Sequence, residues 1–135
     1  MRATWFLPLP LLLAACAAPG VGPDAVPRTV TGDWGGPHVG LRLHADGGAI
    51  EYDCANGTLD APLVVDATGA FRVAGTHVRG HGGPARQGEV LPVEPATYQG
   101  TVRGDRMALE VRTTSMAPAT YALQRGAPAQ VFKCL

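Results

Sequence analysis

The stretch HVGLRLHADGGAIEYDCANGTLDAPLVV, residues 38–65, decides the fold class. In the run from Val39 to Leu43, apolar residues alternate with glycine and arginine. A period of two is typical of a β-strand that buries one face and exposes the other. Turn-forming residues follow, Asp46-Gly47-Gly48 first and Asn56-Gly57 next, and the second pair is a strong hairpin signal. The stretch therefore predicts short antiparallel strands joined by tight turns.

The same alternation continues to the end of the chain. We expect Phe71 and Val73 to face inward, and likewise Met107, Leu109 and Val111. The 18 glycines and 12 prolines of the chain interrupt every segment before a long helix can form. About eight strands follow one another, with residues 129–134 as the last. They predict an all-β fold, a small antiparallel up-and-down barrel, with a β-sandwich as the alternative.

The first 15 residues have the composition of a secretory signal peptide. Arg2 provides the positive start, the apolar run from Trp5 to Leu13 follows, and Ala14-Ala15 are small residues suited to cleavage. The apolar run is much shorter than the roughly 20 residues that a membrane-spanning helix needs. We therefore assign residues 1–15 to a signal peptide, residues 16–30 to a proline- and glycine-rich tether, and residues 31–135 to the barrel domain.

The segment Leu13-Ala14-Ala15-Cys16 resembles the lipobox of bacterial lipoproteins. The resemblance implies that Cys16 is lipidated on sulfur and becomes the N-terminus after cleavage. Acyl chains would then hold the domain at a membrane, on its periplasmic or outer face in the bacterial envelope. An ordinary signal peptide that happens to end in Ala-Ala-Cys is the alternative.

Lipidation of Cys16 leaves Cys54 and Cys134 as the remaining cysteines. An even pair in an oxidising compartment predicts a disulfide, and the alternative is two free thiols. This bond would close a loop of about 80 residues and constrain the unfolded chain strongly.

Composition argues against several functions. The chain has 11 basic and 11 acidic side chains without a basic cluster, so nucleic-acid binding is not expected. The sequence contains neither Gly-x-Ser-x-Gly nor His-Glu-x-x-His, and we expect no catalysis and no cofactor. His77 and His81 have a spacing that suits metal ligands on a helix, but the surrounding glycines exclude a helix at this place. A third ligand would have to come from His38 or Asp53, and we expect no metal site.

Residues 79–95 form the longest expected loop and the candidate binding site. Its segment HGGPAR contains His81, Gly82, Gly83 and Arg86. Backbone N–H groups at the two glycines and the guanidinium of Arg86 suit a carboxylate on a glycan or a peptide terminus. The alternative is that Gly82-Gly83 only shape a turn and that Arg86 is solvated.

Two sets of residues in the barrel domain resemble known families. Gly32-Asp33-Trp34 resembles the Gly-x-Trp that opens lipocalin-like barrels, which implies that Trp34 plugs the barrel. Tyr52, Cys54, Asn56-Gly57-Thr58 and Cys134 are similar to residues of the membrane-bound C-type lysozyme inhibitors, which are small barrels. The sequence departs from those inhibitors at 73–78, which lacks their serine and tyrosine, and it has no late tryptophan. The resemblance thus implies the fold and the disulfide but not the inhibitory residues.

These observations predict a lipid-anchored binding or accessory module of the envelope, whose partner is an envelope protein, a glycan or a peptide. One alternative is a protein inhibitor of a lysozyme-like hydrolase. Another is a small hydrolytic enzyme that uses the 79–95 loop.

We predict that Cys16→Ser releases the protein from membranes or stalls its processing, because serine has no sulfur to carry the acyl chains. Fractionation and immunoblotting measure this, with Cys54→Ser as the control that stays attached. Unchanged membrane attachment of Cys16→Ser would contradict the lipoprotein assignment.

Overall fold

The computed structural model describes residues 26–135. The predicted signal peptide and Cys16 lie outside the described residues, as does most of the predicted tether. Residues 26–135 contain ten strands and no helix, and accordingly no helix in this range could span a membrane.

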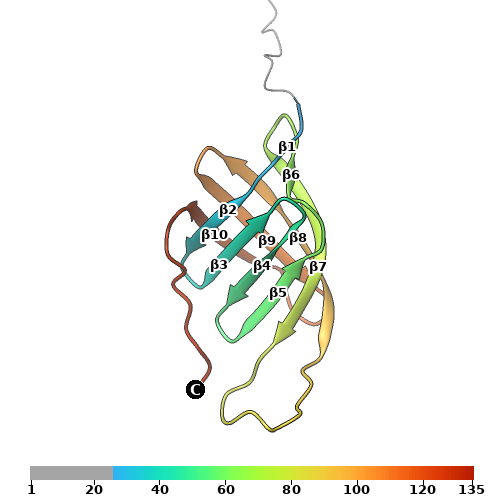
Figure 1. Cartoon of the computed structure of the whole chain (residues 1–135), viewed down its shortest axis with the longest axis vertical. Coiled ribbons are helices and arrows are strands. Elements are labelled where there is room, and N and C mark those ends of the chain that lie inside the picture. The colour runs from blue at the N-terminus through green and yellow to red at the C-terminus, as the bar shows by residue number, and fades with distance from the viewer. Residues whose placement is uncertain (1–25) are drawn as a thin grey trace, which may run out of the picture.

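Eight strands close into an antiparallel barrel (Figure 1). They are β2 (Gly32–Gly36), β3 (Val39–His44), β4 (Gly47–Tyr52), β5 (Ala55–Leu59), β7 (Ala70–Arg79), β8 (Val93–Arg103), β9 (Arg106–Thr113) and β10 (Ala119–Arg125). Each pairs with its neighbours along the chain, and β10 pairs with β2 to close the ring. Two short strands, β1 (Arg28–Thr29) and β6 (Val64–Val65), pair with each other outside the barrel. The predicted up-and-down barrel is confirmed.

The identity of two strands differs from the prediction. The first barrel strand is Gly32–Gly36, which the alternation of apolar residues does not reveal. Residues 129–134, predicted as the last strand, form no strand beyond a single bridge from Gln130 to Pro37. A Cβ atom at Gly35 would lie 2.3 Å from the carbonyl oxygen of Ala127, and one at Gly36 would lie 2.1 Å from that of Ala122. Glycine is required at both positions because the backbone of another segment approaches closely. Since glycine has no side chain, this strand lacks the apolar alternation by which the other strands were predicted.

The turn between β4 and β5 was also wrongly placed. The chain reverses at Asp53-Cys54, where Cys54 has a φ of 58°, and Asn56-Gly57 lies inside β5. A Cβ atom at Gly57 would lie 2.2 Å from the carbonyl oxygen of Thr76 and 2.3 Å from the hydroxyl of Tyr98. Gly57 therefore makes room for the tyrosine that fills the barrel, rather than forming a turn.

The barrel interior is filled by side chains. The residues predicted to face inward are all buried: Val39, Leu41, Leu43, Phe71, Val73, Met107, Leu109 and Val111. Trp34 is 2% exposed, which agrees with its expected place in the core. The Arg125 guanidinium lies 4.4 Å from the centre of its ring and donates a hydrogen bond to the carbonyl oxygen of Thr31 at 2.8 Å. This cation–π contact links the last strand to the first.

The C-terminal segment, residues 126–135, crosses the outer face of β2 and β3. A Cβ atom at Gly40 would lie 2.5 Å from the Cβ of Ala129, so the segment packs directly on the sheet. Farther along, the Phe132 N–H donates to Asp53 Oδ1 at 2.7 Å. The segment then reaches the β4–β5 turn, where Cys54 and Cys134 form the predicted disulfide.

We predict that replacing Cys54 and Cys134 together by serine lowers the melting temperature by about 10 °C or more. In the chain-entropy model, a crosslink between residues 80 positions apart contributes about 4 kcal/mol. Thermal unfolding followed by circular dichroism measures this. Reductant should lower the melting temperature of the native protein and leave the double variant unchanged. Equal melting temperatures of both proteins without reductant would contradict the prediction.

Candidate functional site at the loop end of the barrel

One end of the barrel, which we call the loop end, contains the longest described connection. It comprises the turns Pro37-His38 and Asp53-Cys54 and the connections 80–92 and 114–118. In Figure 1 the described chain enters at the opposite end, beside β1, and the 80–92 loop projects away from it. The candidate binding residues therefore lie far from the point at which the tether joins the barrel.

The loop is shorter than the predicted 79–95. β7 continues to Arg79 and β8 begins at Val93, so Pro95 lies within a strand, opposite Thr76. The pairing of β8 with β9 begins only at Ala96. A proline just before that point is tolerated because the ladder to β9 does not include it.

Hydrogen bonds to Glu89, a residue of the loop itself, hold the 80–92 loop together. His81 Nε2 lies 2.7 Å from Glu89 Oε1, and His81 Nδ1 lies 2.9 Å from the carbonyl oxygen of Gly82. The backbone N–H of Arg86 donates to Glu89 Oε2 at 3.2 Å. The hydrogen bond to Gly82 and then that to Glu89 raise the pKa of His81, while His81 and the Arg86 N–H hold the pKa of Glu89 below its usual value. Sequence reasoning missed Glu89, which lies eight residues beyond His81 along the chain.

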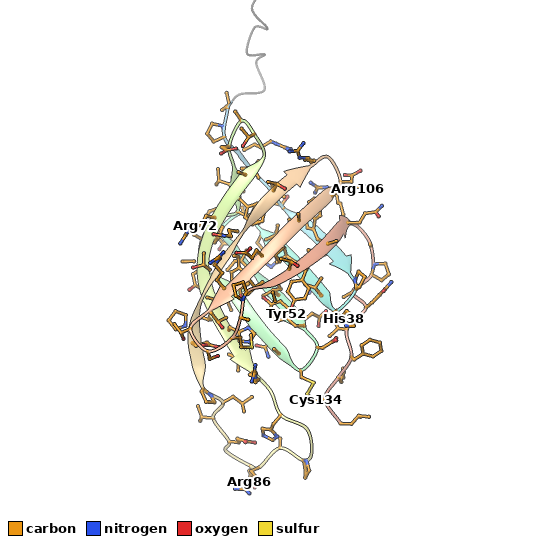
Figure 2. The ribbon with its side chains drawn as sticks, turned by 180° about the vertical axis from the view of Figure 1, so that it is seen from behind. His38, Tyr52, Arg72, Arg86, Arg106 and Cys134 are labelled. Carbon is orange, nitrogen blue, oxygen red and sulfur yellow. A yellow bond between two sulfur atoms is a disulfide. The ribbon has the colours of Figure 1, made fainter. Side chains whose placement is uncertain are left out.

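The two glycines have different surroundings. A Cβ atom at Gly82 would lie 2.3 Å from the backbone oxygen of Leu135, so the end of the chain packs against the loop. Gly83 has a φ of 88° and open space around it. Figure 2 shows Arg86 at the tip of the loop, and no carboxylate of residues 26–135 lies within ion-pair distance of its guanidinium. The structure thus brings His81, Gly82 and the Arg86 backbone together but leaves the guanidinium apart from them.

A pocket of about 470 Å³ lies between this loop and the 114–118 connection, and its lining mixes charged with apolar side chains. The lining includes Arg79, His81, Glu89, Leu91, Glu94 and Ser115. Glu94 accepts hydrogen bonds from the hydroxyls of Thr114 at 2.9 Å and Ser115 at 2.6 Å. These donors, Ser115 foremost, hold the pKa of Glu94 below its usual value. The pocket is therefore both ionic and apolar, as suits an amphipathic group of a partner.

Exposed apolar side chains gather at this end. Val90 is 89% exposed and Val93 62%, while Phe132 is 67% exposed and Leu135 lies fully in solvent. Because the backbone of Leu135 packs against Gly82, the C-terminal segment and the loop form one surface. His38 packs beside this surface. Its Nδ1 lies 2.5 Å from Asp53 Oδ2, and its ring centre lies 5.7 Å from that of Phe132.

His77, one of the two histidines whose spacing was considered for a metal site, lies on a strand and not in the loop. It faces into the barrel from β7 and is 3% exposed, with its ring centre 5.5 Å from that of Tyr52. Neither ring nitrogen has a hydrogen-bond partner among the described residues. The alternation through Phe71 and Val73 reaches His77 when it is continued past Gly75, so the sequence contained the signal.

The structure separates the residues considered for a metal site. His77 is inside the barrel, His81 bonds to Glu89, and His38 bonds to Asp53. Within residues 26–135, no three histidine, cysteine or carboxylate side chains are grouped so that they could hold a metal ion.

Comparison of the chain with protein-family models, curated proteins and solved structures finds no match. The closed barrel is consistent with the lipocalin-like shape that Gly32-Asp33-Trp34 implied. The bond between Cys54 and Cys134 is likewise the one that the resemblance to lysozyme inhibitors implied. Both agreements concern the fold. The function must therefore be inferred from the surfaces of this chain.

We predict that His77→Leu reduces the loss of stability between pH 7 and pH 5. Burial, the largest influence, lowers the pKa of His77 in the folded protein; Glu94 acts in the opposite sense and Arg79 in the same sense. The unfolded chain therefore takes up a proton near pH 6.5 before the folded chain does, so stability falls as the pH falls below that value.

Melting temperatures across this pH range measure the effect. His81→Gln is the matched control and should act oppositely, because a raised pKa in the folded state contributes stability at low pH. Identical pH profiles for the native protein and His77→Leu would contradict the prediction.

Proposed function

We propose that this chain is a lipid-anchored binding module of the bacterial cell envelope, attached through Cys16 and recognising a partner with its loop end. The observation that carries the proposal is that the chain enters the barrel at one end and that the candidate binding loop lies at the other. The described chain enters at the β1 end, and the 80–92 loop and the C-terminus lie at the opposite end (Figure 1). A module tethered at one end would present the other to the envelope space.

The chemistry of the loop end favours a protein or peptide partner. Exposed apolar side chains, among them Val90 and Phe132, lie in the same two segments as the charged residues Arg86 and Lys133. Apolar patches rimmed by polar residues are typical of protein-binding surfaces. The Arg86 guanidinium has no carboxylate within ion-pair distance among residues 26–135, so it is free to meet an acidic group of the partner.

The barrel and its disulfide also support the second candidate, an inhibitor of a lysozyme-like hydrolase. That function is one form of the same binding role, with the loop end inserted into the cleft of the hydrolase. A lysozyme turbidity assay with the purified barrel tests it. A small hydrolytic enzyme that uses the loop pocket is the third candidate, and a panel of ester, peptide and glycoside substrates tests it.

The proposed binding surface predicts that Val90→Ser combined with Phe132→Ser abolishes capture of the envelope partner. The measurement is chemical crosslinking in intact cells followed by mass spectrometry, with the native protein as reference. Arg86→Ala should weaken capture and change the melting temperature by about a degree or less, because a solvated arginine contributes little to stability.

Val64→Ser is the matched control, since Val64 is 42% exposed on β6, away from the loop end. Its capture should equal that of the native protein. If Val64→Ser abolishes capture while the loop-end variants retain it, the proposed binding surface is wrong.

A further inference from the structure

A groove of about 510 Å³ lies on the side of the barrel, apart from the loop end. Strands β8, β9 and β10 line it on one side, and Ala127 and Pro128 of the C-terminal segment line it on the other. The end of β2 contributes Gly35 and Gly36, where no side chain would fit. The volume lies in the range of small-molecule sites.

The strand register explains why this groove is hollow. Thr101 of β8, Ala108 of β9 and Ala122 of β10 are cross-strand neighbours, and all three line the groove. Met107 and Leu123, their neighbours along the chain, are buried in the core, so the alternation of side chains places Ala108 and Ala122 on the outer face. Because these two side chains are short, the groove has an apolar floor.

Two arginines lie along one side of this floor. Arg103 pairs with Arg106 across the hairpin of β8 and β9, and Arg106 pairs with Gln124 of β10. All three residues are exposed, and all three line the groove. Neighbouring strands lie about 4.8 Å apart. Two guanidinium groups and one amide therefore extend from a single row across three adjacent strands.

Neither arginine has a counterion in the described part of the chain. No carboxylate of residues 26–135 lies within ion-pair distance of Arg103 or Arg106, and Asp105, in the turn between them, pairs instead with Arg125 at 3.2 Å. Like charges directly opposite each other in a sheet are destabilising. The barrel thus gains no ion pair from these two arginines, and a bound anion would offset the repulsion between them.

The other side of the floor is polar as well, which limits the length of an apolar ligand. Glu110, the next outward-facing residue of β9 after Ala108, accepts hydrogen bonds from Gln99 at 3.0 Å and from Arg112. Glu110 follows Arg106 by four positions, which is roughly 13 Å along a strand. A short alkyl chain fits this distance. Its anionic group would lie at the arginine side, because the carboxylate of Glu110 would repel it.

We propose that this groove binds a single amphiphile, a phosphate monoester on a short alkyl chain. The phosphate lies between Arg103 and Arg106, where its two negative charges match the two guanidinium groups. The alkyl chain rests on Ala108 and Ala122, against the wall that includes Pro128. The two arginines select a dianion, because a carboxylate would neutralise only one of them.

Isothermal titration calorimetry with octyl phosphate at pH 8 tests the proposal. We expect saturable binding at one site, weakened by added salt. Octanol and inorganic phosphate should each bind at least about tenfold more weakly, because each lacks one of the two recognised groups. Arginine stays protonated, so affinity for octyl phosphate should rise from pH 5.5 to pH 8 as the phosphate loses its second proton. Affinity for octanoate should be lower and should change little over that range.

Two groove variants test the assignment of residues. Arg103→Gln combined with Arg106→Gln should lower the affinity for octyl phosphate about tenfold, because both charged donors are lost. Ala108→Glu should weaken binding at least as much, since it places a carboxylate on the floor, two positions from Arg106 and on the same face of β9. Melting temperatures establish that both variants are folded.

Matched controls come from exposed residues that do not line the groove. Arg28→Gln combined with Arg72→Gln removes the same charge as the arginine double variant, and Ala74→Glu adds the same charge as Ala108→Glu. Both controls should bind octyl phosphate as the native protein does.

Equal affinity for octyl phosphate and octanol, or for octyl phosphate and octanoate, would overturn the proposal, as would unchanged binding in both groove variants. Binding to vesicles of anionic phospholipid without binding of octyl phosphate would also overturn it and would identify a membrane-contacting surface. Figure 2 shows Arg106 at the end of the barrel away from Arg86. None of these outcomes depends on the loop end, so the two proposals fail separately.

Discussion

Only two residue pairs, Gln124 with Gly35 and Arg125 with Trp34, close the sheet into a barrel. The Arg125 guanidinium stacks on the buried indole of Trp34 and bonds to the carbonyl oxygen of Thr31, so the last strand is tied to the first. A cation–π contact of this kind contributes about 0.5–2 kcal/mol, and Trp34 adds the burial of a large apolar side chain. Without this seam, β2 and β10 would each expose a complete strand edge.

The C-terminal segment depends on that closure and shapes the surfaces around it. It lies over Gly35 and Gly40, where no side chain could fit, and it ends at the disulfide beside the loop. Along the way, Ala127 and Pro128 line a groove beside β10, and the end of the segment brings the exposed side chains of Phe132 and Leu135 to the loop end. Backbone hydrogen bonds join Gly126, Ala127 and Gln130 to the barrel, but beyond Gln130 the segment makes only the hydrogen bond from the Phe132 N–H to Asp53. The disulfide therefore fixes the part of the segment that has the fewest hydrogen bonds.

The surface carboxylates of Glu89 and Glu94 and the buried ring of His77 differ in their hydrogen bonding. Glu89 and Glu94 each receive several donors at the surface, and these hold their pKa values low. His77 has no partner among the described residues, and burial lowers its pKa and so favours the neutral ring. A buried polar group without a hydrogen bond costs about 1–3 kcal/mol, so His77 opposes the stability that Trp34 and the disulfide provide. Glu94, the cross-strand neighbour of His77, lines the pocket beside the 80–92 loop, so this unfavourable contribution lies at the loop end of the barrel.

The all-β class, the number of barrel strands, the up-and-down pairing and the cysteine pairing could all be predicted from the amino-acid sequence. Alternation of side chains has a period of two whatever the tertiary contacts, and neighbouring strands joined by short turns pair with one another. The inward-facing side chains between Val39 and Val111 could be predicted for the same reason. His77 could have been added by continuing that alternation, and the candidate loop was recognisable from its length and its glycines. Other features depend on tertiary contacts. Gly35 in the first barrel strand and Gly57 in β5 are glycines because distant atoms leave no room for a Cβ: the Ala127 carbonyl at Gly35, and the Thr76 carbonyl and Tyr98 hydroxyl at Gly57. Local sequence patterns could not show that these glycines lie within strands. Glu89 closes the loop, and Leu135 packs against Gly82, through contacts that follow from no local pattern. Local preferences depend on a few neighbouring residues, whereas close approach and ion pairing depend on where the whole barrel places the chain.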